Sequence, residues 1–183
     1  MIIVWILVGF IGLCILWLIV TYNGLVSLRN RTKEAWSDID VQLKRRYDLI
    51  PNLVESVRGY AKHEKDVFKE VTLARAEAMK AKGMSAKSEK EDALSDALKS
   101  VFAIAENYPQ LRANENFLQL QTALTETEDK LEAARRFYNG NVREINTQIE
   151  IFPNNLISNS LGFKKMELFE AKSGEKEKVE VKF

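Results

Sequence analysis

The chain has 183 residues, the length of one domain of ordinary size. Its 27 Lys and Arg against 26 Asp and Glu leave a net charge of +1, and this balance argues against a nucleic-acid-binding protein, because neutralising phosphates takes a strong basic surplus. The single Cys and single His exclude an intramolecular disulfide, a cysteine zinc site and any metal site that needs two imidazoles.

The first 22 residues predict a membrane anchor. The run from Met1 to Val20 carries no charge, and as a helix it is about 30 Å long, the thickness of the hydrocarbon core of a bilayer. A cleaved signal peptide is the alternative, but the run is too long, has no basic residues before it and is followed by no small-x-small cleavage site. The predicted anchor residues are Trp5, Gly9, Gly12, Trp17 and Tyr22.

Basic residues predict the orientation of this anchor. None precedes the apolar run, whereas Arg29, Arg31 and Lys33 follow it. The positive-inside rule therefore places the amino terminus outside and the rest of the chain in the cytoplasm.

The same basic residues, together with Lys44 and Arg45, are a candidate surface for anionic lipid headgroups or for a partner. Near an anionic membrane, each basic side chain contributes about 1 kcal/mol to binding. The alternative is ion pairing along the helix with neighbours such as Asp40. Arg46 lies on the apolar seam described next, so we expect it to be paired within the fold.

Apolar residues recur at alternating steps of three and four over residues 36–78, 94–108 and 117–152, which indicates helices that pack along a coiled-coil-like seam. We therefore predict an all-α fold, with residues 23–163 forming an antiparallel, up-and-down four-helix bundle. The first stretch offers two breaks. The favoured break follows Arg58, with Gly59 as a left-handed C-terminal residue and Pro51 as a kink; a break at Pro51, or one kinked helix over 23–82, are the alternatives.

The predicted third region, residues 164–183, is an extended tail. Val179, Val181 and Phe183 alternate with charged residues, which is typical of a strand, and residues 164–171 are a possible partner strand. Because a lone hairpin is marginal in water, the tail is either disordered or paired with something else. One hypothesis is strand addition to a second copy or to a domain that captures the terminal carboxylate; an edge strand on the chain's own bundle is the alternative.

The sequence offers no catalytic constellation. A zinc protease pattern starting at His63 would need a second His where Val67 stands. A phosphoryl-accepting His63 on a helical bundle is conceivable, but the pattern that usually follows such a His is absent, and a surface His is the simpler interpretation. Glycine-rich phosphate loops and Gly-x-Ser-x-Gly elbows are absent too. We therefore predict no enzyme, no catalytic residue, no metal and no cofactor.

Several stretches together resemble the LemA family and cover nearly the whole chain. They are Tyr22–Val26, Ala35–Leu53, Gly59–Tyr60 with His63–Glu64, Tyr108–Pro109, Ala113–Phe117, Leu120–Gln121, Ala134–Asn139, Phe152–Asn155 and Gly162–Phe163. The resemblance implies a single N-terminal anchor, an extracytoplasmic amino terminus and a four-helix bundle. No enzymatic activity is established for the family; its members accompany membrane-embedded heat-shock proteases and small envelope proteins, and one relative takes part in forming the magnetosome membrane.

The expected function is a non-enzymatic, single-pass membrane scaffold that self-associates and organises membrane or membrane-protein assemblies in the bacterial inner membrane. The alternatives are an adaptor of a membrane-embedded stress protease and, more remotely, a phosphorelay bundle using His63. The expected partners are membrane lipid and a second copy, with a membrane protease or another envelope protein as a further possibility. Nucleic acid and small-molecule substrates are not expected.

Overall fold

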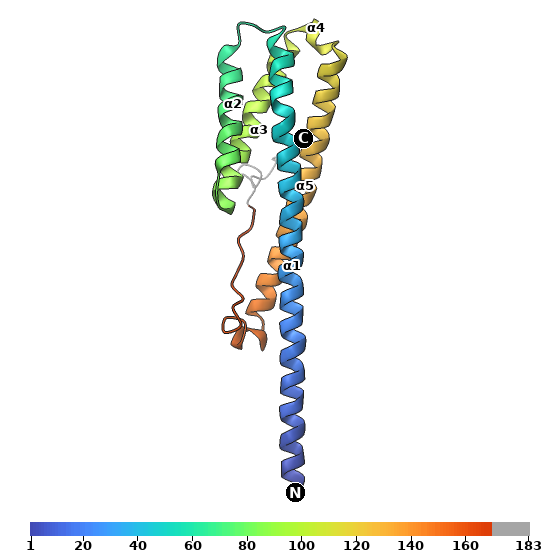
Figure 1. Ribbon diagram of the computed structural model, residues 1–183, viewed down its shortest axis with the longest axis vertical. Helices are drawn as coiled ribbons and strands as arrows, with labels where there is room; N and C mark the ends of the chain where they lie inside the picture. The colour runs from blue at the N-terminus through green and yellow to red at the C-terminus, as the bar shows by residue number, and fades with distance from the viewer. Residues whose placement is uncertain (170–183) are drawn as a thin grey trace, which may run out of the picture. The chain divides into compact units, whose positions relative to one another are not determined.

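All regular secondary structure in residues 1–169, the part of the chain that the structure describes, is helical (Figure 1). This computed structural model confirms the predicted all-α class. The elements are α1 (Ile2–Arg58), α2 (Lys65–Lys80), α3 (Met84–Glu106), α4 (Pro109–Arg112), α5 (Glu115–Glu150) and the 3-10 turn η1 (Asn154–Leu156). Residues 164–169, the described part of the expected partner strand, form no strand, and the expected strand at Val179–Phe183 lies outside the described residues.

The chain divides into two compact units. Among the described residues, the anchor unit comprises residues 1–37 and 136–168, and the body unit comprises residues 38–135 and Phe169. Helices α1 and α5 each contribute one part to either unit, whereas α2, α3 and α4 belong to the body unit alone.

The predicted break after Arg58 is confirmed, since α1 ends there and contains Pro51 in its interior. The predicted left-handed Gly59 is wrong: the described glycines with positive φ are Gly83 and Gly162. The helix closes instead through ordinary turns, with the N–H groups of Tyr60 and Ala61 both donating to the carbonyl of Val57 at 3.0 and 2.9 Å.

Pro51 stays inside α1 because another helix supplies a donor for the backbone. Proline has no N–H to donate to the carbonyl four residues earlier, which is that of Tyr47. Arg75 of α2 donates its Nε–H to this carbonyl at 2.7 Å. The side chain of Arg75 therefore replaces the helical hydrogen bond that Pro51 removes.

The core of the body unit follows the predicted seams with one phase error. Buried apolar residues from α1, α2, α3, α4 and α5 form it: Ile39, Leu43, Ile50, Leu53, Val57, Phe68, Val71, Leu94, Val101, Leu111, Phe117, Leu124 and Leu131. The predicted apolar repeat over residues 36–78 includes Tyr60 and Val67, but Tyr60 is exposed and Phe68 is buried in place of Val67. The chain turns between α1 and α2, so the helical phase starts anew at Lys65.

The anchor unit is held by the segment that follows α5. Leu25 of α1 packs with Ile145 and Ile149 of α5 and with Phe163 of the returning segment. Asn146 fixes this segment with two hydrogen bonds: its Nδ2 donates to the carbonyl of Met166 at 2.9 Å, and its Oδ1 accepts the N–H of Met166 at 2.8 Å. Segment 157–168 is therefore an integral part of the unit.

The bond between Arg75 and the Tyr47 carbonyl generates a double-mutant test. We expect Arg75→Met to lower the free energy of unfolding by about 1–2 kcal/mol, because the carbonyl loses a charged donor. In a Pro51→Ala background the loss is smaller, since residue 51 then has an N–H for Tyr47. The measurement is denaturant unfolding of the detergent-solubilised chain. Lys69→Met, an exposed change on the same helix, is the control; equal losses from Arg75→Met in both backgrounds would contradict the assignment.

Candidate functional site

The first part of α1 presents its apolar side chains outward. Among residues 1–169, α1 is the one helix that is long and apolar enough to cross a membrane. Trp5 is 74% exposed and Leu13 is 67% exposed, while Trp17 is half-buried. A Cβ added at Gly9 or Gly12 would meet nothing within 4 Å. Trp5, Gly9 and Gly12 thus lie on a free helical surface, which is what lipid contact requires.

Tyr22 and the first basic residues lie where this apolar surface ends. The ring of Tyr22 meets Phe163 edge-on, with ring centroids 5.8 Å apart. The guanidinium of Arg29 lies 5.2 Å from the centroid of the same Phe163 ring. Arg31 and Lys33 are exposed. Of the residues in the predicted headgroup surface, Arg29 therefore has a contact within the fold, with the ring of Phe163.

The remaining two residues of that predicted surface, Lys44 and Arg45, belong to the body unit and are exposed there. Arg46 is only 2% exposed and is paired within the fold, as its place on the apolar seam predicted. His63 is exposed in the connection between α1 and α2, in agreement with its interpretation as a surface His. Val179, Val181 and Phe183 lie outside the described residues.

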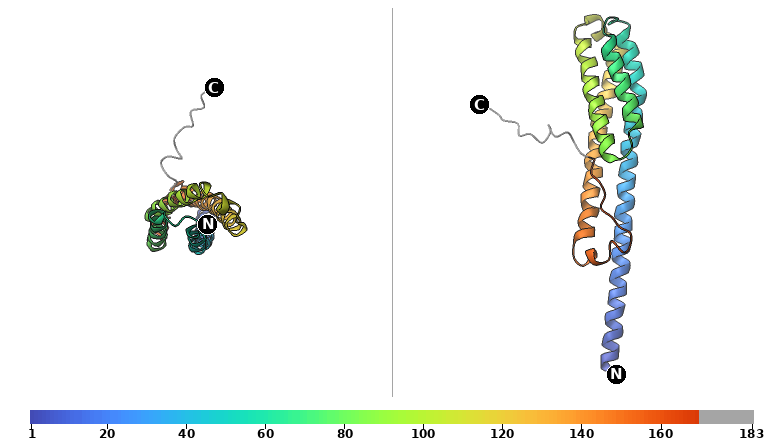
Figure 2. Two further views of the ribbon diagram at one scale, coloured as in Figure 1. Left: turned by 90° about the horizontal axis from the view of Figure 1, so that it is seen from above. Right: turned by 90° about the vertical axis from the view of Figure 1, so that its left-hand side faces the viewer.

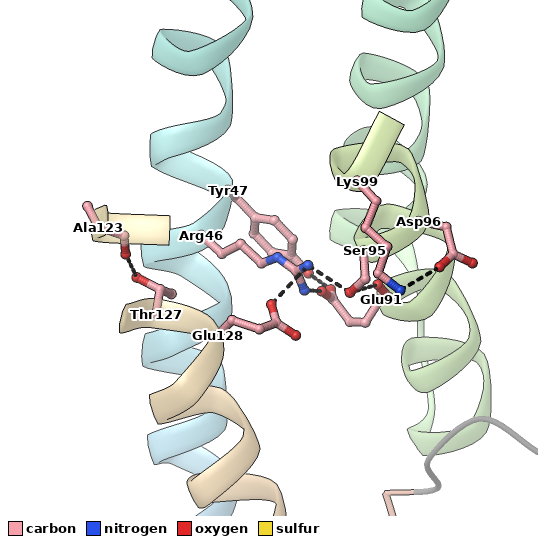
Figure 3. A network of polar contacts seen from close by, with 9 residues as sticks. All are labelled: Arg46, Tyr47, Glu91, Ser95, Asp96, Lys99, Ala123, Thr127 and Glu128. Carbon is pink, nitrogen blue, oxygen red and sulfur yellow. Dashed lines mark hydrogen bonds and ion pairs between the residues drawn. The ribbon is translucent and has the colours of Figure 1, made fainter. Parts of the chain in front are cut away.

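Arg46 is the centre of a buried ionic cluster in the body unit (Figure 3). One guanidinium nitrogen lies 3.4 Å from Glu91 Oε2 of α3. The other donates to Ser95 Oγ at 2.7 Å and lies 3.0 Å from Glu128 Oε2 of α5. The hydroxyl of Tyr47 donates to Glu91 Oε1. These bonds join α1, α3 and α5 at one level of the body unit.

Burial dominates the electrostatics of this cluster. Glu91 is 0% exposed, and its burial raises the pKa of the carboxyl group above the ordinary value, while the Tyr47 hydroxyl and the Arg46 charge lower it. Burial, followed by the hydrogen bond to Glu91, raises the pKa of the Tyr47 hydroxyl. Tyr47 therefore stays a proton donor to Glu91 throughout the physiological range.

Next to the cluster is a pocket of about 300 Å³ whose lining carries charges of both signs. Arg46, Lys99 and Arg135 face four carboxylates there: Asp92, Asp96, Glu128 and Asp129. Burial lowers the pKa of Arg135, whose guanidinium lies 4.5 Å from the centroid of the Phe169 ring. Arg46 pairs with Glu128 in this lining, whereas Nε and one terminal nitrogen of Arg135 are buried there without a hydrogen-bond partner.

Glu91, Ser95 and Glu128 were not predicted from the sequence as the partners of Arg46, nor was Tyr47 as the donor to Glu91. One signal for Glu91 was present, because it stands three residues before Leu94 and so continues the apolar face of α3 with a carboxylate. A basic residue interrupting one seam and an acidic residue interrupting another are complementary in a packed helical fold.

The fold and these sites define a class of protein: an all-helical body joined without a break to one N-terminal apolar helix. The LemA family model matches residues 35–183 of the chain. The chain therefore belongs to the LemA family.

Curated relatives agree with this assignment. The chain is 26% identical over 181 residues to magnetosome protein MamQ 2 of Paramagnetospirillum magneticum, a match covering 85% of this chain and 66% of the relative. It is 25% identical to magnetosome protein MamQ of Magnetospirillum gryphiswaldense, with the same coverage. It is 29% identical over 164 residues to protein LemA of Metamycoplasma hominis, covering 87% of this chain and 72% of that one. Family and fold together fit a membrane-associated helical protein.

The raised pKa of Glu91 predicts how stability depends on pH. A carboxyl group whose pKa is higher in the folded state stabilises the fold at low pH, and this contribution is lost as pH rises through the raised pKa. We therefore expect the melting temperature of the natural chain, relative to Glu91→Gln, to rise as pH is lowered from 8 towards the ordinary value of 4.5. Glutamine keeps the size and the carbonyl acceptor for Tyr47, so the comparison isolates the charge.

This dependence is measured by circular-dichroism melting of both proteins in the same detergent. The quantity compared is the melting temperature of the natural chain minus that of Glu91→Gln. If this quantity increases towards high pH, or does not change with pH, the prediction is contradicted. The charged and titratable groups facing Glu91 are Arg46, Tyr47, Lys87 and Arg135.

Proposed function

We propose that the chain is a non-enzymatic scaffold of the bacterial inner membrane that self-associates and organises membrane or membrane-protein assemblies. In this proposal α1 crosses the membrane once, with the amino terminus outside and the body in the cytoplasm. The helices of the body form an up-and-down, antiparallel four-helix bundle, with α1, α2, α3 and α5 as its members.

The observation that carries the proposal is the continuity of α1. The apolar part of this helix and the part that packs in the body unit belong to one element, Ile2–Arg58. A helix without a linker transmits the orientation of the body to the membrane-spanning part, whereas a tethered enzyme or a flexible adaptor needs only a loose linker. An uninterrupted helix thus suits a protein that holds neighbouring copies in a fixed geometry.

Two further features support a structural role. The buried Arg46 of the body unit is paired within the fold, with Glu91 and Glu128. The relatives named magnetosome proteins are named for a cellular structure and for no reaction. Self-association itself rests on the C-terminal alternation of Val179, Val181 and Phe183 with charged residues, which suits strand pairing between copies.

The test is the mass of the detergent-solubilised full-length chain, measured by light scattering on a sizing column, beside a version that ends at Ser173. We expect a large, discrete assembly that collapses on truncation, because removing residues 174–183 removes the pairing strand. A full-length Val179→Ser/Val181→Ser/Phe183→Ser variant should collapse as well.

The matched control changes the opposite face of the same strand, Glu180→Gln with Lys182→Gln, and should leave the assembly intact. A monomer for both the full-length and the truncated chain would overturn the scaffold. Such a monomer that co-purifies with one membrane protease in fixed proportion would favour the adaptor instead.

A further inference from the structure

The connection that follows α5 exposes three large apolar side chains within six residues. Ile151 is 41% exposed, Phe152 77% and Leu156 67%. We name residues 151–156 the apolar loop. The sequence pattern placed Phe152 on the buried face of the last helix, but α5 ends at Glu150 and the ring of Phe152 points to solvent. Phe152 is as exposed as the apolar side chains at the start of α1, such as Ile2 at 76%.

Hydrogen bonds hold the apolar loop in one shape. Asn154 Nδ2 donates to the carbonyl of Gln148 at 3.1 Å and lies 3.2 Å from its side-chain oxygen. Ser158 Oγ donates to the carbonyl of Asn154 at 2.7 Å. Phe152 and Leu156 are thus exposed on a hydrogen-bonded turn, which contains η1, and not on a loose end.

Within the anchor unit the apolar loop lies beside the end of the apolar part of α1. One pocket is lined both by Val20, Thr21 and Gly24 of α1 and by Gln148 and Asn154. Figure 2 shows the turn after α5 next to α1, in the orange and red of residues 150–160. Val20 is the last residue of the uncharged apolar run, so the apolar loop lies at the level where α1 leaves the hydrocarbon.

The surroundings of the apolar loop are those of a membrane interface. Tyr22 lies on the same unit with its ring against Phe163, and aromatic side chains favour the headgroup level of a bilayer. Arg31 and Lys164 are exposed on the same unit, and Lys165 is exposed and paired with Glu150. Such cations complement lipid phosphates just outside an apolar surface.

We propose that the apolar loop is a second membrane contact, which inserts Phe152 and Leu156 into the interfacial region of the bilayer that α1 spans. The lipid is the occupant because the loop continues the apolar surface of α1 at its interfacial end. A helix with a single span can rotate about its axis. With the loop inserted on one side, α1 has a fixed rotation in the membrane. The inference rests on the membrane placement of α1 and is independent of self-association.

The experiment measures membrane depth with spin labels. Full-length Cys14→Ala protein receives one cysteine at a time, at Phe152, at Phe137 or at Leu13, and is reconstituted into vesicles of phosphatidylcholine and phosphatidylglycerol. Phe137 is the matched control, because it is a phenylalanine of the same unit with 60% exposure, placed 15 residues earlier on α5. Leu13 is the reference inside the span. Circular dichroism confirms the fold of each labelled protein.

For each label we take the ratio of its collision rate with oxygen to its collision rate with a water-soluble nickel chelate. We expect this ratio to be several-fold higher for the Phe152 label than for the Phe137 label, and similar to that of the Leu13 label. A Phe152 label as accessible to the chelate as the Phe137 label overturns the inference. So does a Phe152 label shielded from both reagents, which would mean that protein covers it. If the Leu13 label itself meets the chelate, α1 does not span the bilayer, and the membrane placement in the proposed function fails as well.

Discussion

The structure depends on one helix, α1, whose first part exposes its apolar side chains and whose second part buries them in the body unit. In lipid, every backbone polar group must find its partner within the helix, so the first part of α1 can expose apolar side chains only if its hydrogen bonding is unbroken. In water, a helix is held mainly by packing its apolar face, and the part of α1 after Asp38 does this with Ile39, Leu43 and Leu53. Both requirements are met by one element, Ile2–Arg58, and the units form around its two parts.

The buried ion cluster restricts how the helices of the body unit can pack. An apolar seam tolerates small shifts of one helix along another, because one leucine replaces another at little cost. Arg46 and Glu91 tolerate none, since a shift by one turn would leave each charge buried and unpaired, at about 3–5 kcal/mol. The Tyr47 hydroxyl donates a hydrogen bond to the other carboxylate oxygen of Glu91. The cluster therefore sets the register of α1, α3 and α5, which the apolar seams alone leave open.

Patterns in the sequence predicted the features of the fold that depend on residues close together along the chain. The helical class, the break after Arg58 and the pairing of Arg46 all follow from periodicity and from interruptions of it. The burial of Phe68 in place of Val67 did not, because the turn between α1 and α2 resets the helical phase. The donor that Arg75 supplies to the Tyr47 carbonyl and the choice of Glu91 as the partner of Arg46 depend on contacts between helices. The exposure of Phe152 was missed since the apolar pattern continues past Glu150, where the helix itself ends.

The central claim, that α1 continues from the membrane into the body without a break, is tested most directly by one distance. Spin labels at Leu13→Cys and Lys33→Cys, in a Cys14→Ala chain in lipid nanodiscs, flank the stretch that contains Gly24. Double electron–electron resonance should give a narrow distribution near about 30 Å, the rise of twenty helical residues. A broad distribution centred at shorter distances would mean that the helix breaks at the membrane surface, and it would contradict the account.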